Sequence, residues 1–376
     1  MLAEAKSLAE HGAFANPFDI ANTGFTAVNP PLYPVVLALL MKVLTAPRFF
    51  MLAALVGNIV ANALTAAWLP RMSFVFYGDA IPGAVAALLW LAAVQVMPAW
   101  DTSFTVAGVI LFCLFSNRYI GRTDSDIRFG SAAGVAAGLL FLLNPSSAMI
   151  SLPWIAYLFV HRRYSLERAG TVSAILLASL FLVVSPWLLR NYYQFGALVV
   201  RTNLGMTLYA SNNDCAESSL AETERDGCYQ THHPNVSLTE AQLLRTLGEV
   251  NYDFRRTADA EAWAMANPAR FWQLTGQRVR DFWLPPPEQH PYKTYVIWLA
   301  TLLAIPGMIL MIKRHKPVLA FLMAAQLIYP FMYYVVISDV RYRYPVLWLS
   351  LLPAGYFIRR ISRVGLHLPV RHNSAQ

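Results

Sequence analysis

The stretch that decides the fold is GTVSAILLASLFLVVSPWLL, residues 170–189. It contains no charged residue, and its length matches the roughly 20 residues that an α-helix needs to cross the hydrocarbon core of a bilayer. A strand of the same composition would leave unpaired backbone groups in lipid, because no water is present there to satisfy them. The stretch therefore predicts a membrane-spanning helix.

Similar apolar segments occur on both sides of this stretch. They are residues 31–46, 50–70, 80–98, 103–117, 130–143, 147–160, 294–312, 318–337 and 345–360. Several are shorter than the roughly 20 residues of a comfortable span, and we expect those to be half-spans or to pack against protein. The pattern predicts an all-α membrane protein, a polytopic helical bundle of about nine or ten hydrophobic segments.

Composition supports this fold class. Hydrophobic residues make up 57% of the 376 residues and charged residues only 13%, whereas a soluble domain carries about 25% charged residues. A soluble globular enzyme and a disordered chain are therefore excluded. The net charge of +8 could indicate nucleic-acid binding, but basic residues in membrane proteins collect on cytoplasmic loops. We therefore expect no nucleic-acid partner.

Four basic clusters set the expected orientation. They are Arg118, Arg122 and Arg128; Arg162, Arg163 and Arg168; Lys313, Arg314 and Lys316; and Arg359, Arg360 and Arg363. Placing all four in the cytoplasm satisfies the positive-inside rule. The outer face then holds Asp101, segment 190–292 and the turn 338–344. Segment 31–46 breaks the alternation, since it must be re-entrant if residues 1–28 lie outside and must cross if they lie inside.

Segment 190–292 is the long polar stretch of the chain, and it carries two helix-start signals. Ser237 and Glu240 form a capping box ahead of AQLLRTL. Asn267 and Pro268 supply an N-cap and a proline at the first helical position. We therefore expect a small, mainly helical domain on the outer face. The remaining chain divides into membrane helices at 31–189 and 293–362 and a cytoplasmic tail at 363–376.

Asp101, in PAWDTSF, is the first candidate for chemistry. A polar turn between two membrane helices needs a polar residue, and that structural explanation is sufficient for many such acids. A carboxylate at a membrane face can also bind a cation or orient a substrate group. Both interpretations fit the sequence, and a divalent cation is the one cofactor that we consider.

Three arginines are candidates for phosphate binding because they lie on the outer side, against the positive-inside bias. Arg341 and Arg343 occur in SDVRYRYP, and Arg190 occurs in PWLLRN. The planar guanidinium fork suits bidentate binding of phosphate. The structural alternatives are an ion pair with Asp339 and snorkelling of the side chain to the membrane interface.

Cys215 and Cys228 lie in the expected outer domain, where an oxidising compartment permits a disulfide. Two reduced thiols are the alternative. His232 and His233 lack a third ligand at metal-site spacing, so we interpret them as part of a surface loop. Whether the protein requires a metal is left open.

Several motifs, in order, resemble those of one enzyme family. They are similar to segments of the polytopic GT-C glycosyltransferases. In chain order they are AEAKSLAEHGAF followed by NPPLYPVVLALLMKVL (29–44), PAWDTSF, SPWLLRNYYQFGALVVRTNLGMTLYASNND and SDVRYRYP. The resemblance is to the bacterial family 39-like group, which includes the protein O-mannosyltransferases and the lipid A aminoarabinose transferase. Each motif alone is weak, but their shared order covers nearly the whole chain.

The resemblance implies an inner-membrane cell-envelope transferase. It would move a sugar from a polyprenyl-phosphate donor to a lipid, glycan or protein acceptor at the outer face of the cytoplasmic membrane. The acidic residue of the family's second outer loop carries over onto Asp101, a catalytic residue that would assist the acid of the first outer loop or bind a cation. The three outer arginines would be ligands of the lipid phosphate. The acceptor or donor site would include Asn29, Tyr33, Asn191, Asn212 and Asn213. Membrane lipids are the other expected partners.

One element of the family pattern is not found in the printed sequence. The catalytic acid of the first outer loop, and a membrane helix before it, would lie upstream of the position that Met1 occupies, so residues 1–30 read as a remnant of that loop. Glu4 is the nearest acid, but its spacing to Gly12 is too short for the role. We expect the native protein to start earlier; the alternative is a degenerate, non-catalytic accessory protein.

A lipid-linked sugar flippase or other transporter is a further alternative. That class predicts polar or charged residues in the middle of spans. Asn58 and Asn62, one turn apart in segment 50–70, are the main polar residues of that kind. We interpret them as donors of hydrogen bonds between helices.

Overall fold

The computed structural model describes residues 1–120, 125–287 and 291–365. Arg122 of the first basic cluster, residues 288–290 of the expected outer domain and residues 366–376 of the expected tail lie outside the described residues. Within the described ranges the chain forms α-helices and short 3-10 helices, with two isolated β-bridges and no strand. The all-α prediction is confirmed.

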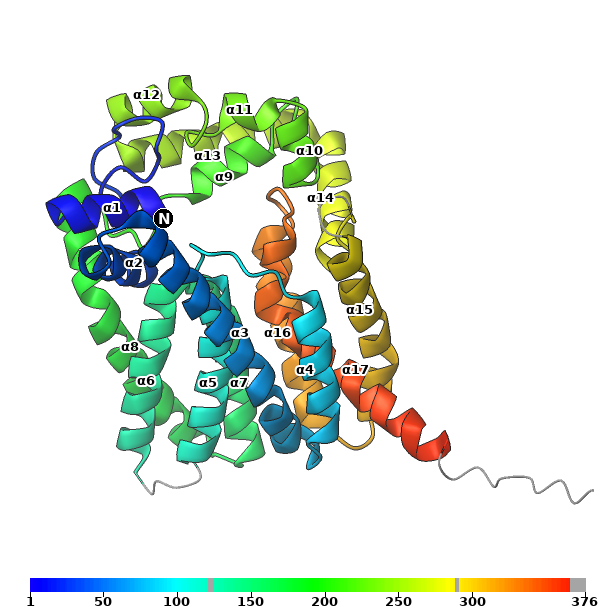
Figure 1. The fold of residues 1–376 in the computed structure, drawn as a ribbon. Coiled ribbons are helices and arrows are strands. Elements are labelled where there is room, and N and C mark those ends of the chain that lie inside the picture. Colours follow the sequence, from blue (N-terminus) through cyan, green and yellow to red (C-terminus); the bar gives the residue numbers. More distant parts are fainter. Residues whose placement is uncertain (121–124, 288–290, 366–376) are drawn as a thin grey trace, which may run out of the picture.

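The helices form three groups in space (Figure 1). Two short helices open it, namely α1 (Leu2–His11) and α2 (Leu32–Val43). The bundle contains α3 (Pro47–Tyr77), α4 (Ile81–Ala93), α5 (Thr102–Ile120), α6 (Asp126–Leu143), α7 (Ala148–His161), α8 (Leu166–Phe195), α15 (Pro291–Met311), α16 (Lys316–Ile328) and α17 (Tyr344–Gly365). The outer helices are α9 (Leu204–Ser211), α10 (Leu220–Arg225), α11 (Cys228–His232), α12 (Leu238–Leu247), α13 (Glu249–Ala266) and α14 (Pro268–Trp283).

Six helical segments of the described chain are long and apolar enough to span a membrane. They are α3, α5, α6, α8, α15 and the segment Lys316–Tyr333, in which the 3-10 helix η2 (Tyr329–Tyr333) continues α16. The chain is therefore a helical, multi-pass membrane protein. With 12 residues, α2 extends only about 18 Å at 1.5 Å per residue, well short of the roughly 30 Å hydrocarbon core. It packs against α1 at the same end as the outer helices (Figure 1).

Close packing of α6 against α8 depends on three glycines spaced four residues apart. A Cβ atom added at Gly134 would lie 2.3 Å from the carbonyl oxygen of Leu176, and one at Gly138 would lie 2.8 Å from the Cβ of Val183. Gly130, one turn earlier, is similarly close to Ile175. Small residues on one face let two backbones approach in lipid, where no hydrophobic force drives helices together.

Two buried asparagines of α3 donate hydrogen bonds to neighbouring helices. Asn62 donates a hydrogen bond of 2.9 Å from Nδ2 to Ser103 Oγ, which joins α3 to α5. Asn58 donates from Nδ2 to the hydroxyl of Tyr33 on α2 at 3.1 Å. The interpretation of both asparagines as donors between helices is confirmed.

The two ends of the bundle differ in character. The outer helices α9–α14 cover one end. The C-terminal end of α5, the N-terminal end of α6, the α7–α8 and α15–α16 connections and the C-terminal end of α17 lie at the opposite end (Figure 1). The basic clusters flank these connections. At that end Asp79 pairs with Arg359 at 3.3 Å and with Arg363 at 2.7 Å. The cytoplasmic assignment of this end stays a prediction.

Residues 12–31, which we call the N-terminal segment, join α1 to α2 and pack against the outer helices. Arg190 donates from Nη1 to the carbonyl of Thr26 at 2.8 Å and from Nη2 to that of Phe14 at 2.9 Å. The amide of Ala27 donates to Glu249 Oε1 at 2.6 Å. Side chains from α8 and α13 therefore hold this segment in place.

Candidate functional site

Asp101 lies directly before α5, at the end of the segment that links α4 to α5. Its side chain is buried and accepts a 2.8 Å hydrogen bond at Oδ2 from Nδ2 of Asn144, the residue that ends α6. Burial raises the pKa of the Asp101 carboxyl, against the opposing effects of the Asn144 hydrogen bond and of the charges of Arg201 and Arg341. Asp101 is therefore part of a polar cluster with Asn144, Arg201 and Arg341.

Arg341 approaches this acid from the turn before α17. Its guanidinium lies 4.1 Å from the centre of the Trp100 ring, and Trp100 directly precedes Asp101. The Nε of Arg341 also lies 3.0 Å from Asp339 Oδ2. The ion pair considered from the sequence is thus present, and the same arginine still acts electrostatically on Asp101.

Arg343 is the most unusual side chain of the cluster. It is 1% exposed, and its Nη2 donates at 2.6 Å to Ser350 Oγ, which in turn donates to Gln326 Oε1 at 2.7 Å. Its Nε and Nη1 have no hydrogen-bond partner. Among the described residues no acid forms an ion pair with it, and the ring of Trp283 lies 4.4 Å from its guanidinium carbon. A permanent cation is thus buried with two free donors.

Arg201 belongs to the same cluster, and the sequence analysis did not select it. It donates from Nε to the carbonyl of Val28 at 3.0 Å. Burial lowers its pKa, and the charge of Asp101 opposes that shift most strongly. The signal that could have found it is the one that selected Arg190, because Arg201 is also a basic residue on the predicted outer side.

Arg190 has a well-defined position away from Asp101. Besides its two carbonyl contacts to the N-terminal segment, its Nη1 donates to Asn191 Oδ1 at 2.9 Å, and its guanidinium lies 5.1 Å from the Trp187 ring. Asn191 in turn donates to the carbonyl of Val199 at 2.8 Å. These contacts fix the C-terminal end of α8 against the N-terminal segment. Phosphate binding by Arg190 and substrate contact by Asn191 stay predictions.

Asn29 lies beside Glu4, an acid that the spacing argument had set aside. Nδ2 of Asn29 donates at 2.8 Å to Oε2 of Glu4, which is fully buried, and Oε1 of Glu4 has no partner. Burial raises the pKa of Glu4 to about 7. The hydroxyl of Tyr33 lies 3.5 Å from the carbonyl of Pro98, in the same linking segment as Asp101. Asn29 thus contacts Glu4 directly, whereas Tyr33 contacts the segment that leads to Asp101.

Asn212 and Asn213 stabilise the start of residues 212–228, which contain Cys215 and Cys228 and which we call the disulfide segment. Asn212 donates from Nδ2 to the carbonyl of Val335 at 3.0 Å and accepts at Oδ1 from Arg278 Nη1 at 3.1 Å. Asn213 accepts at Oδ1 from the amide of Cys215 at 3.1 Å. Their amide groups are engaged with protein, and direct contact with a substrate stays a prediction.

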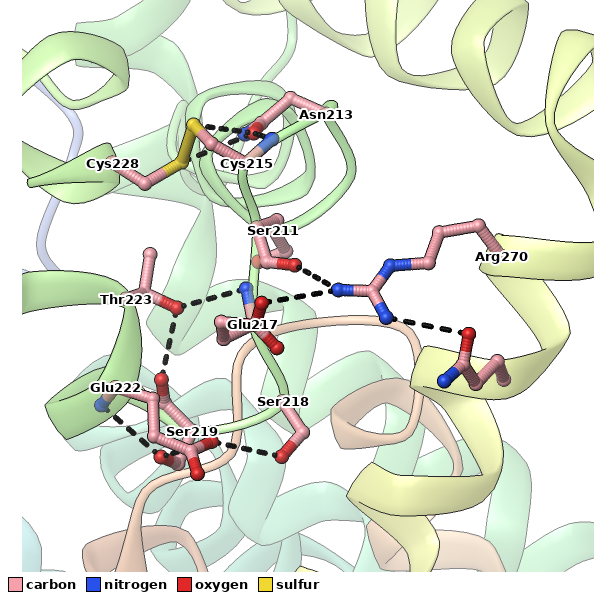
Figure 2. A network of polar contacts seen from close by, with 12 residues as sticks. Ser211, Asn213, Cys215, Glu217, Ser218, Ser219, Glu222, Thr223, Cys228 and Arg270 are labelled. Atoms are coloured by element: carbon pink, nitrogen blue, oxygen red, sulfur yellow. Dashed lines mark hydrogen bonds and ion pairs between the residues drawn. A yellow bond between two sulfur atoms is a disulfide. The ribbon is translucent and has the colours of Figure 1, made fainter. Parts of the chain in front are cut away.

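Figure 2 shows the disulfide between Cys215 and Cys228. Their Cα atoms lie 5.6 Å apart. Together with His232 they are the one group of potential metal ligands found among the described residues, with ligand atoms within 4.8 Å of one another. A cysteine binds zinc as its thiolate, and both sulfurs of this group are consumed by the disulfide. The bonded form therefore does not fit a metal centre.

The disulfide segment also fixes the turn that carries the arginines. Arg270 of α14 donates to the carbonyl of Ala216 at 3.1 Å, and Ser218 Oγ donates to Asp281 Oδ2 at 2.7 Å (Figure 2 draws the Arg270 contact). The amide of Ser338 then donates to the carbonyl of Ser218 at 2.8 Å. This bridge joins the outer helices to the 3-10 helix η3 (Val340–Tyr342), next to Arg343.

Asp101 is thus grouped with Asn144, Arg201 and Arg341 at the junction of bundle and outer helices. Arg343 lies two residues after Arg341 and has two nitrogens without a hydrogen-bond partner among the described residues. Such a set can bind a phosphate and position a hydroxyl group beside it. Comparison of the chain with protein-family models, with characterised proteins and with solved structures finds no match.

Proposed function

We propose that this protein is an integral-membrane glycosyltransferase that moves a sugar from a polyprenyl-phosphate donor to a lipid, glycan or protein acceptor at the outer face of the cytoplasmic membrane. The observation that carries the proposal is Arg343, a fully buried cation with two unpartnered nitrogens and no acidic partner among the described residues. The family resemblance of the sequence motifs adds the reaction class.

A buried arginine without an anion is costly, because desolvation of one ion costs several kcal/mol. The guanidinium remains protonated rather than escaping this cost by losing its proton. A phosphate oxygen would accept from the two free donors and balance the charge at once. The position of Arg343 directly before α17 suits a phosphate whose lipid tail enters the membrane between helices.

In the proposed reaction the acceptor hydroxyl oxygen forms a bond to the anomeric carbon of the donor sugar. The bond from that carbon to the phosphate oxygen breaks, and the lipid phosphate leaves with the electron pair. The hydroxyl proton passes to a carboxylate, for which Asp101 is the candidate. Arg343 and Arg341 would stabilise the charge that develops on the leaving phosphate without any proton transfer.

The first test measures thermal unfolding of the purified full chain in lipid nanodiscs with undecaprenyl phosphate or with undecaprenol. Ligand that binds the folded state raises its unfolding temperature. We expect the phosphate to raise it and the matched alcohol to have little effect. Equal effects of the two lipids would overturn the phosphate site.

The second test follows radiolabelled sugar from a polyprenyl-phosphate donor pool in membranes that contain the protein. Labelled acceptor product supports the transferase. Movement of the labelled donor across the membrane without product would instead identify a flippase. Specific phosphate binding without either event would identify a non-catalytic partner.

A further inference from the structure

A pocket lies among the outer helices, apart from the arginine cluster. Its volume is about 380 Å³, and its walls include Tyr209 of α9, Asp214 of the disulfide segment, His232 of α11, and Asp259 and Trp263 of α13. A cavity of this size is within the range of small-molecule sites. The disulfide contributes Cys215 to the same wall, so the pocket depends on a covalently fixed segment.

The pocket has a surplus of negative charge. Arg256 pairs with Asp259 at 2.7 Å, but the same guanidinium is already neutralised by Glu240, to which its Nε donates at 2.9 Å. Asp214 has no basic partner among the described residues. Neither lysine nor arginine lines the pocket, and Arg255 nearby is exposed. An anionic ligand is therefore disfavoured, whereas a cation gains from the uncompensated charge.

The aromatic wall of the pocket is held in a fixed orientation. Trp263 donates from Nε1 to Asp214 Oδ1 at 2.7 Å, and no residue of the described chain donates a hydrogen bond to the other carboxylate oxygen. Asp259 and Trp263 are one turn apart on α13, so both side chains project from the same face of the helix. The guanidinium of Arg256 lies 4.0 Å from the centre of the Tyr209 ring, so Trp263 is the ring that remains for a ligand.

We propose that this pocket binds the ammonium group of a small polar amine. An indole face is the best aromatic partner for a cation, and a carboxylate beside it supplies charge-assisted hydrogen bonds. Oxygens of Asp214 and Asp259 would accept from the ammonium, which has donors and no acceptor. The amine can come from an aminosugar or from an ethanolamine headgroup, which share this chemistry.

The test measures binding to the full chain in nanodiscs by isothermal titration calorimetry. The probes are glucosamine and ethanolamine, with glucose and ethylene glycol as neutral counterparts of matching size. Binding of glucosamine alone identifies an aminosugar site, binding of ethanolamine alone identifies a headgroup site, and binding of both identifies recognition of the ammonium itself. Equal binding of amines and neutral counterparts, or no binding of either amine, overturns the proposal.

Variants locate the binding in this pocket. We expect Asp214→Asn and Asp259→Asn each to weaken amine binding about fivefold, as befits partly exposed charge pairs, and Trp263→Leu to weaken it about fivefold through the lost cation–π contact. Asp226→Asn is the matched control, because Asp226 is exposed and lies outside the pocket. Unchanged binding in the double variant of Asp214 and Asp259 would contradict the assignment, provided thermal unfolding shows that the variant is folded.

Discussion

The guanidinium carbon of Arg341 lies 4.1 Å from the centre of the Trp100 ring. This contact joins the turn before α17 to the segment before α5, and it places a cation beside the carboxylate of Asp101. A stacked guanidinium keeps its edge donors available for an anion, since the ring takes only its face. The two predicted residue types, acid and arginine, are therefore neighbours in space although far apart in the chain.

Replacement of Arg343 by methionine separates a binding role from a structural one. Because the cation is buried without an acidic partner, we expect Arg343→Met to leave the free energy of unfolding unchanged or to raise it by about 1–3 kcal/mol. Stabilisation by undecaprenyl phosphate should disappear in the same variant. The measurement is thermal unfolding in nanodiscs with and without that lipid.

Arg225→Met is the control for this experiment, because Arg225 is exposed and pairs only with exposed Asp226. It should retain the lipid effect. A strongly destabilised Arg343→Met protein would show instead that the arginine supports the fold.

Asp101→Asn should reduce sugar transfer by at least about 100-fold, the scale of a lost acid–base group. The substitution keeps the side-chain shape and the oxygen that accepts from Asn144, so thermal unfolding should change little. The labelled-sugar assay in membranes checks this, with Asp226→Asn as control. Full activity in the Asp101 variant would remove this carboxylate from the reaction.

Glu4 makes stability depend on pH. Its folded-state pKa of about 7 exceeds the ordinary value of 4.5, so between these values the folded protein binds more protons than the unfolded chain. The contribution of Glu4 to stability is therefore greatest below about pH 4.5 and falls as pH rises towards 7, by up to about 3 kcal/mol. Chemical unfolding of the wild-type protein and of Glu4→Gln at pH 5 and pH 7.5 measures the difference.

Stability of the Glu4→Gln variant should depend less on pH than that of the wild-type protein, because glutamine stays neutral at pH 5 and at pH 7.5. A residual slope is expected, since burial raises the pKa of Glu249 and Asp101 in the same direction. Identical slopes in the two proteins would show that Glu4 ionises normally.

Reduction of the Cys215–Cys228 bond should destabilise the outer helices. A loop of about 15 residues contributes roughly 3 kcal/mol in the chain-entropy model. Thiol labelling in denaturant, followed by mass spectrometry, should find one reactive cysteine without reductant and three with it, because Cys113 is the free thiol. Labelling of all three without reductant would contradict the bond.

Arg190→Ala should loosen the N-terminal segment. The substitution removes the donors to the carbonyls of Thr26 and Phe14, and segments with fewer buried contacts open more readily. We expect faster proteolytic cleavage between residues 12 and 31 and little change in lipid-phosphate binding. Lost phosphate binding with an unchanged cleavage rate would assign Arg190 to the phosphate site instead.

The sequence predicted the helical segments well because lipid permits few alternatives for an apolar run. Residues 170–189 lie inside the single helix α8, and segment 50–70 lies inside α3. The predicted lengths of the helices were less accurate. Segment 80–98 becomes the 13-residue α4 followed by an extended stretch towards Asp101, because the apolar residues continue after the helix has ended.

The candidate site was predictable only in part. Asp101, Arg341 and Arg343 could be selected because charge on the outer side of a bundle is unusual. Their grouping with Arg201 and Asn144 could not, since it depends on how separate loops fold over the end of the bundle. The buried state of Glu4 was equally inaccessible, because a short helix with polar residues reads as a surface element.

The hydrogen bond from Ala27 to Glu249 spans 222 positions of the chain, and this distance has a consequence for biosynthesis. At about 5–20 residues per second, the ribosome reaches Glu249 roughly 10–45 s after Ala27. During that interval the amide of Ala27 is without its native partner. This contact therefore forms only after α13 has been made, although Ala27 itself was made more than 200 residues before it.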